Sequence, residues 1–299
     1  MYRNEFIKFD DKVELCVYLW EPKTEPIGII QLAHGMAEHL GRYDEFGEHF
    51  KNSGYLVVGA DHYAHGRSVK DSKEIGVIKD YDFIDAIVKS IKLVYQNYVE
   101  KYDLPKTLFS HSMGSMVAQS YIEIYPDDFS KAIICGTDAP TFLYALAKVL
   151  TKKKGRIGHI EYWPVAENMG VSSFNKKFKK EEDSVAWLSI DLDNRERYRK
   201  DPLTGAQFPT NYYYSLAKSL RDSKRKENRA KINKNIKLLL IAGEDDPVGH
   251  FGKGPKALNK QYLKLGLSSE VVLFKGRHEI LNESSINEDV YAKLDSFIK

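Results

Sequence analysis

The chain has 299 residues, of which 42% are hydrophobic and 29% charged, a composition that excludes a disordered chain and supplies a sizeable core. No apolar run is long enough to span a membrane and the N-terminus has no apolar signal core, so we expect a globular cytoplasmic protein. Cys16 and Cys135 lie far apart inside apolar runs, which predicts two buried free thiols and no metal spacing.

The N-terminal part of the chain alternates apolar runs with helical patterns. Residues 6–9 and 13–20 predict a hairpin at a sheet edge. Further strands are predicted where short apolar runs end in polar or glycine-containing segments, and helices where apolar residues recur every three or four positions. The strands are expected at 27–32, 55–60, 108–109 and 132–135, and the helices at 43–52, 81–102 and directly after residue 112.

Residues 138–235 differ from both flanks in charge and in periodicity. They carry 21 Lys and Arg against 12 Asp and Glu, a net charge of +9, whereas the rest of the chain carries 24 against 30. They show helical and irregular stretches without a clear buried strand. Strand character returns at 236–242, and a helix, a strand and a terminal helix are expected at 252–265, 271–274 and 290–298.

Strands that alternate with helices predict an α/β fold with a mostly parallel central sheet flanked by helices. We expect residues 1–137 and 236–299 to form this core and residues 138–235 to be inserted between two core strands. In such a sheet, functional side chains gather at the carboxyl ends of the strands.

The segment Ser110-His111-Ser112-Met113-Gly114 follows a short strand and opens a helix. It is similar to a G-x-S-x-G turn with Ser110 in place of the first glycine, which puts Ser112 at the apex. A hydroxyl at the apex can be reached by a histidine from another loop, and the Met113 amide can stabilise an oxyanion. The alternative is an ordinary strand-to-helix connection that contains a serine.

Two later strand ends carry the residue types that activate a serine. Asp246 follows the strand at 236–242, and His278 follows the strand at 271–274. The acid would orient the histidine, and the histidine would take the proton of Ser112. A polar turn and a surface histidine are the alternative interpretation. Asp245 and Asp138 are rival acids, and we favour Asp246.

The turn His34-Gly35-Met36 follows the strand at 27–32. Its glycine permits a turn that aims the Met36 amide at the same point as the Met113 amide, so the two would form an oxyanion hole. A plain glycine-containing turn is the alternative.

Five stretches together resemble the monoacylglycerol lipase and lysophospholipase branch of the α/β-hydrolases. They are HGMAEHLGRY (34–43), DHYAHGRS (61–68), SHSMG (110–114), GEDDPVG (243–249) and RHEILNE (277–283). The resemblance implies an α/β-hydrolase fold with a helical cap insertion and acyl-ester hydrolysis through an acyl-serine intermediate, without a cofactor. It implies Ser112 as nucleophile, His278 as proton relay and Asp246 as the acid that holds His278.

The resemblance also implies that Glu38 and Arg42 lie near the polar end of the substrate pocket. The sequence departs from the family at Leu281, where mammalian monoacylglycerol lipase carries a second histidine three positions after the catalytic one. A glycerol head group is therefore not specifically implied.

The stretch 142–150 is apolar nearly all round, and Phe142 and Leu146 are our candidates for residues that line an acyl tunnel. A membrane-facing helix and a buried structural helix are the alternatives. The basic residues of 138–235 would attract anionic lipid headgroups during transient membrane contact, or form a solvated face. The expected partner is a small-molecule lipid ester, with no nucleic acid and no metal.

The leading hypothesis is a serine ester hydrolase acting on monoacylglycerol, lysophospholipid or a similar single-chain ester. A peptidase releasing N-terminal proline is a close rival, but that group usually carries H-G-G-P-G, which is missing here. Epoxide hydrolases and dehalogenases have aspartate where Ser112 stands. A catalytically silent binding module on the same fold is the rival from another class.

Overall fold

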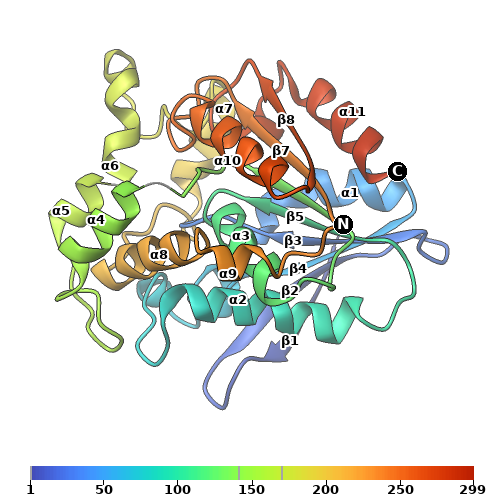
Figure 1. Cartoon of the computed structure of the whole chain (residues 1–299), viewed down its shortest axis with the longest axis horizontal. Helices are drawn as coiled ribbons and strands as arrows, with labels where there is room; N and C mark the ends of the chain where they lie inside the picture. The colour runs from blue at the N-terminus through green and yellow to red at the C-terminus, as the bar shows by residue number, and fades with distance from the viewer. Residues whose placement is uncertain (1, 141, 170) are drawn as a thin grey trace.

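The computed structural model describes residues 2–140, 142–169 and 171–299 (Figure 1). Eight strands form one sheet in the order β1-β2-β4-β3-β5-β6-β7-β8. Only the pairs β1–β2 and β2–β4 are antiparallel, so the predicted mostly parallel sheet is confirmed. The strands are β1 (Arg3–Lys8), β2 (Glu14–Trp20), β3 (Gly28–Ala33), β4 (Tyr55–Ala60), β5 (Lys106–His111), β6 (Lys131–Cys135), β7 (Lys237–Gly243) and β8 (Ser268–Phe274).

Helices cover both faces of the sheet. Successive residues of a strand point to opposite faces, and accordingly Ile29 and Ile30 of β3 belong to different apolar clusters. The cluster that contains Ile30 packs the sheet against two helices, and the cluster that contains Ile29 packs it against three. The first pair is α1 (Asp44–Asn52) and α11 (Asn287–Ile298), and the second set is α2 (Phe83–Val94), α3 (Met113–Ile124) and α10 (Lys253–Lys264).

The helix predicted at 81–102 is shorter than expected as an α-helix. Asp82 caps its start, because the side chain accepts a hydrogen bond from the Asp85 amide. The α-helix ends at Val94, and the π-helical turn η4 (Tyr95–Val99) follows. Short 3₁₀ turns complete the core: η1 (Leu40–Tyr43), η2 (Gly66–Ser68), η3 (Ser72–Glu74) and η6 (Ile280–Asn282).

Between β6 and β7 the described residues form helices and loops but no strand. The elements are α4 (Phe142–Thr151), α5 (Pro164–Met169), α6 (Val171–Phe174), η5 (Asn175–Glu181), α7 (Leu192–Lys200), α8 (Thr210–Asp222) and α9 (Lys226–Arg229). α8 packs against α4 and against the core helix α2, while α4, α5 and α6 lie at one side of the molecule (Figure 1). None of the helices in the described ranges is both long and apolar enough to cross a membrane.

Candidate functional site

Ser112 lies at the sharp turn between β5 and α3, as predicted. Its backbone has φ +53° and ψ −120°, a conformation that costs about 1–3 kcal/mol for a residue with a side chain. Gly114 is required, because a Cβ there would come within 2.3 Å of the carbonyl oxygen of Ala33. Ser110 fits in place of the usual glycine because its hydroxyl is buried and donates to the carbonyl of Ile133 at 2.9 Å.

Three of the predicted side chains form one hydrogen-bonded chain. His278 Nε2 lies 2.8 Å from Ser112 Oγ, and His278 Nδ1 lies 3.0 Å from Asp246 Oδ1. Both His278 and Asp246 are buried, and Asp246 Oδ1 also accepts from the amide of Val248 at 2.9 Å. In this arrangement the carboxylate fixes the tautomer with Nδ1–H, which leaves Nε2 free to accept the proton of the serine hydroxyl.

The two rival acids have other partners. Asp245 is exposed and forms an ion pair with Lys177. Asp138 is buried, and its carboxylate accepts from the hydroxyl of Tyr144 at 2.6 Å and lies 3.3 Å from His250 Nε2. The hydrogen-bonding partner of His278 Nδ1 is therefore Asp246.

The loop after β3 passes directly beside Ser112. A Cβ on Gly35 would come within 2.9 Å of Ser112 Cβ, so only glycine allows this approach. Met36 follows Gly35, and Ala37 has φ +55°. Met113 is the first residue of α3, where an amide has no acceptor within the helix. Of the two residues predicted for the oxyanion hole, Met113 thus follows Ser112 at the start of α3, and Met36 lies in the loop that passes beside Ser112.

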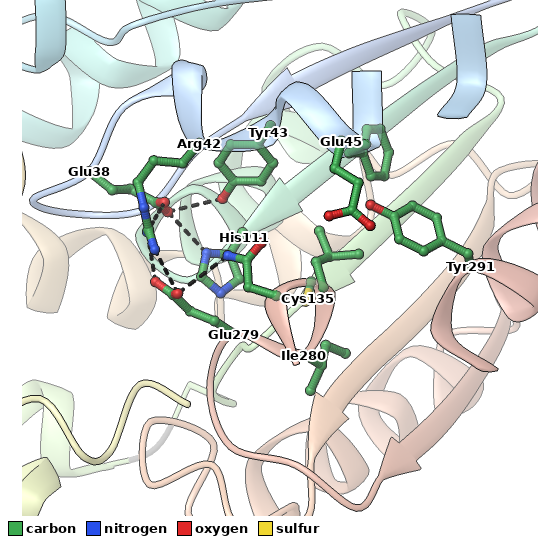
Figure 2. Close-up of a pocket in the computed structure, with 12 residues that line it drawn as sticks. Glu38, Arg42, Tyr43, Glu45, His111, Cys135, Glu279, Ile280 and Tyr291 are labelled. Carbon is green, nitrogen blue, oxygen red and sulfur yellow. Dashed lines mark hydrogen bonds and ion pairs between the residues drawn. The ribbon is translucent and has the colours of Figure 1, made fainter. Parts of the chain in front are cut away.

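Glu38 and Arg42 belong to a buried polar network next to this loop (Figure 2). One oxygen of Glu38 accepts from the Gly35 amide at 2.6 Å and from the Tyr43 hydroxyl at 3.0 Å, and the other accepts from Arg42 at 2.9 Å. Arg42 also donates to both oxygens of Glu279 at 2.7 Å, which is a bidentate pair. Other residues of the protein thus form hydrogen bonds with both Glu38 and Arg42, the two residues predicted for the pocket. These bonds favour a role for both in holding the loops.

Burial disfavours the charged forms in this network, but the partners outweigh it. Arg42 holds the pKa of Glu279 below its ordinary value, and the hydrogen bond and charge of His111, followed by the charge of Arg42, hold the pKa of Glu38 well below it. Glu38 and Glu279 are therefore both carboxylates.

The segment 181–205 contacts the two loops that carry His278 and Met36. On the His278 side, Asn194 donates to Glu279 at 2.7 Å and the Glu279 amide donates to the carbonyl of Leu188 at 2.8 Å. On the Met36 side, three links are present: Tyr198 hydroxyl to Ala37 carbonyl at 3.2 Å, Gly205 amide to Ala37 carbonyl at 3.0 Å, and His39 to Asp201 at 2.8 Å. This part of the chain between β6 and β7 therefore holds both loops in place.

An apolar cluster that the sequence did not predict lies over the site. The Trp187 ring packs 5.1 Å from the His278 ring and 5.1 Å from the Phe174 ring. Trp187 belongs to a cluster that also contains Met116 of α3 and Val248 of the Asp246 loop. A single tryptophan in an irregular stretch carries no sequence signal for this position.

Leu146 does not lie in an enclosed tunnel, because 51% of its surface is exposed. Val149, on the same helix, is 69% exposed. The side chain of Phe142 lies outside the described residues. The expected tunnel at 142–150 is therefore replaced by an exposed apolar face on α4. An apolar stretch of sequence does not distinguish a covered helix face from an open one.

The sheet order, with two antiparallel pairs at one edge and a serine turn after β5, defines an α/β-hydrolase. The chain belongs to the serine aminopeptidase S33 family, whose model matches residues 24–285.

Curated relatives share part of the chain. A monoacylglycerol lipase from Mycolicibacterium smegmatis is 32% identical over 146 residues, which cover 47% of this chain and 50% of that protein. The rat monoglyceride lipase is 32% identical over 129 residues, covering 43% and 40%. The matches thus span about half or less of the length of these relatives.

Solved structures share the whole fold. A carboxyl esterase from Bacillus coagulans in complex with glycerol has a TM-score of 0.89 and 24% identity, covering 100% of this chain and 99% of that one. A soluble variant of the Saccharomyces cerevisiae monoglyceride lipase has a TM-score of 0.73 and 16% identity, covering 100% and 96%.

Proposed function

We propose that this protein hydrolyses carboxylic esters of single-chain lipids, such as monoacylglycerols or lysophospholipids, through an acyl-serine intermediate. The observation that carries the proposal is the hydrogen-bonded chain from Ser112 through His278 to Asp246. Ser112 Oγ attacks the ester carbonyl while His278 Nε2 takes its proton, and Asp246 stabilises the imidazolium that forms. The amides of Met36 and Met113 stabilise the oxyanion.

The tetrahedral intermediate then breaks down to the acyl-serine, which water hydrolyses in a second step. The alcohol leaves with the proton from His278, and the acyl group stays on Ser112 as an ester. A water molecule gives a proton to the same nitrogen and attacks the acyl carbon, and His278 then returns that proton to Ser112 Oγ as the bond between Oγ and the acyl carbon breaks, which releases the fatty acid and restores the Ser112 hydroxyl. No cofactor takes part in this sequence of steps.

The substrate class rests on the surroundings of Ser112 and on the names of the relatives. Trp187, Met116 and Val248 place apolar surface around the nucleophile and its acid loop. Each methylene of an acyl chain buried against such a surface contributes up to about 0.8 kcal/mol. Two curated relatives are named as lipases for monoacylglycerol, which supports the same class of substrate.

The first test is a series of substrates. We expect kcat/KM for p-nitrophenyl esters to rise from acetate to octanoate, by up to about fourfold per methylene, because longer chains bury more apolar surface. Initial rates on esters, 1-monoacylglycerols and lysophosphatidylcholines would then rank the head groups. A flat profile from acetate to octanoate would contradict the lipid assignment but not ester hydrolysis.

Proline p-nitroanilide and a fluorophosphonate probe, added to this panel, separate the alternatives. A proline-releasing peptidase would hydrolyse proline p-nitroanilide faster than any ester, and the missing H-G-G-P-G motif speaks against it. A silent binding module would leave every substrate and a fluorophosphonate probe unreacted.

We also propose that the exposed face of α4 and the residues that follow it contact anionic lipid surfaces. Leu146, Val149 and Leu150 are between 47% and 69% exposed, and Ile157 is 60% exposed. The stretch 142–160 carries five Lys and Arg and no Asp or Glu. Basic residues near an anionic membrane contribute about 1 kcal/mol each, and the apolar side chains add burial in the interface.

A vesicle flotation assay tests this contact. We expect the protein to float with vesicles that contain phosphatidylserine, and Val149→Asn combined with Lys152→Glu to reduce the bound fraction at least tenfold. Ile27→Asn is the matched control, since Ile27 is 57% exposed but lies outside the inserted segment. Equal binding of the double variant and the wild type would rule out this surface.

A further inference from the structure

His111 belongs to the buried polar network of Glu38, Arg42, Tyr43 and Glu279. Each of its two ring nitrogens lies within hydrogen-bonding distance of an acceptor. Nδ1 lies 3.0 Å from Glu38 Oε1, and Nε2 lies 3.3 Å from the backbone carbonyl of His278 (Figure 2 shows the ring among its neighbours). A neutral imidazole carries one N–H and one lone pair. A neutral ring would therefore point a lone pair at a buried oxygen, whereas an imidazolium donates to both.

The charges around the ring lead to the same state. Glu38 and Glu279 are buried carboxylates, and Arg42 lies between them as a single cation. A protonated His111 makes the four groups neutral as a set, and a neutral His111 leaves one buried negative charge uncompensated, which is costly.

The other titratable groups near the ring add no positive charge that could replace that of His111. Tyr43 packs its ring 6.4 Å from His111, and Cys135 pairs with His111 across β5 and β6. Burial raises the pKa of the Tyr43 hydroxyl and of the Cys135 thiol well above their ordinary values, so both are neutral. The His278 ring lies 4.7 Å away, with Asp246 on its far side.

We propose that His111 is a buried imidazolium that positions the catalytic histidine loop, by bridging the Glu38 carboxylate and the His278 carbonyl. Glu38 in turn accepts from the Gly35 amide, so this one ring connects the loop of the oxyanion hole to the loop of His278. His111 is a positioning residue that does not contact the substrate, and its role rests on the proposed hydrolase function. Its protonated state does not depend on that function.

The direction of titration follows from the surroundings. Burial disfavours the charged ring, but the hydrogen bond and charge of Glu38, and then the charge of Glu279, raise the pKa of His111. The bridge is therefore complete below the ordinary histidine pKa of about 6.5 and is lost as the pH rises through the raised value.

The protonation state of His111 can be measured by NMR, and two other buried histidines serve as internal references. His62 and His65 are buried and have no carboxylate hydrogen-bonded to them among the residues that the structure describes, and burial is the main cause that lowers their pKa to about 3 and about 4. In ¹⁵N-histidine NMR spectra of the unmodified protein near pH 6.5, we expect both His111 ring nitrogens to be protonated and the His62 and His65 rings to be neutral. An unprotonated ring nitrogen on His111 at that pH overturns the proposal, with no variant required.

Two variants connect this state to positioning. Glu38→Gln keeps an acceptor for the Gly35 amide but removes the negative charge, so His111 should lose its proton at lower pH. His111→Gln should lower kcat about 10- to 100-fold and change KM less than threefold, because misplacement of the catalytic loop affects the chemical step. In the wild type, we expect activity to fall at alkaline pH as His111 loses its proton. His111→Gln should remove this fall.

The matched control is His49→Gln, which removes a histidine–carboxylate pair of similar length, 3.0 Å from His49 on α1 to Asp295 on α11. It should keep the wild-type kcat and pH profile. Wild-type kcat and pH profile in His111→Gln contradict the positioning role. If the unmodified protein turns over no ester and takes up no fluorophosphonate, the proposed function fails, while the NMR titration still decides the state of His111.

Discussion

Ser112→Ala is expected to lower ester hydrolysis by on the order of 10⁴- to 10⁶-fold, because it removes the atom that attacks the carbonyl in the proposed mechanism. The fold should survive, since the hydroxyl serves the site and not the core. Steady-state turnover of p-nitrophenyl butyrate and labelling by a fluorophosphonate probe measure the loss, and circular dichroism checks the fold.

Ser110→Gly is the matched control for this change. Ser110 lies two residues away on the same turn, and its hydroxyl donates only to the carbonyl of Ile133 among the described contacts. Glycine is the residue usually found at this position of the turn, so labelling and turnover should stay close to the wild type. Labelling that persists in Ser112→Ala would assign the nucleophile to another residue.

Asp246→Asn is expected to lower kcat by about 10³- to 10⁴-fold while Ser112 and His278 keep their positions. The amide cannot stabilise the imidazolium, and its NH₂ group favours the wrong tautomer of His278. Single-turnover acylation followed at several pH values measures this effect apart from substrate binding.

Asp245→Asn is the control next in sequence. Its carboxylate is half exposed and pairs with Lys177 at the surface, a contact worth about 0–1 kcal/mol. Activity should therefore change little. Asp138→Asn tests the other rival, and a loss there as large as that of Asp246→Asn would move the acid to the loop after β6.

The core of the fold and the three hydrogen-bonded residues could be predicted because they depend on local patterns. The strand at 236–242 contains the apolar run 238–242, which Asp246 follows four positions later, and the strand at 271–274 ends in a turn that carries His278. Parallel strands bring their carboxyl ends to one edge of the sheet, so residues far apart in sequence meet there.

The remaining features depend on contacts that leave no local pattern. Glu279, the partner of Arg42, lies 237 positions away in sequence. Trp187, which lies between β6 and β7 in the chain, packs on His278 91 positions away without a local sequence pattern that indicates the contact. The exposure of Leu146 could not be predicted either, because a helix has the same apolar sequence whether or not a neighbouring element covers it.

The contacts of segment 181–205 affect how chimaeric hydrolases should be built from this scaffold. A graft that replaces all of 138–235 would remove Asn194, Tyr198 and Asp201, and with them the links that hold the loops of Met36 and His278. Donor sequence exchanged only between residues 142 and 169 would change the outer surface and keep those links. The fusion points compatible with turnover therefore lie within residues 138–235 and not at the two ends of this range.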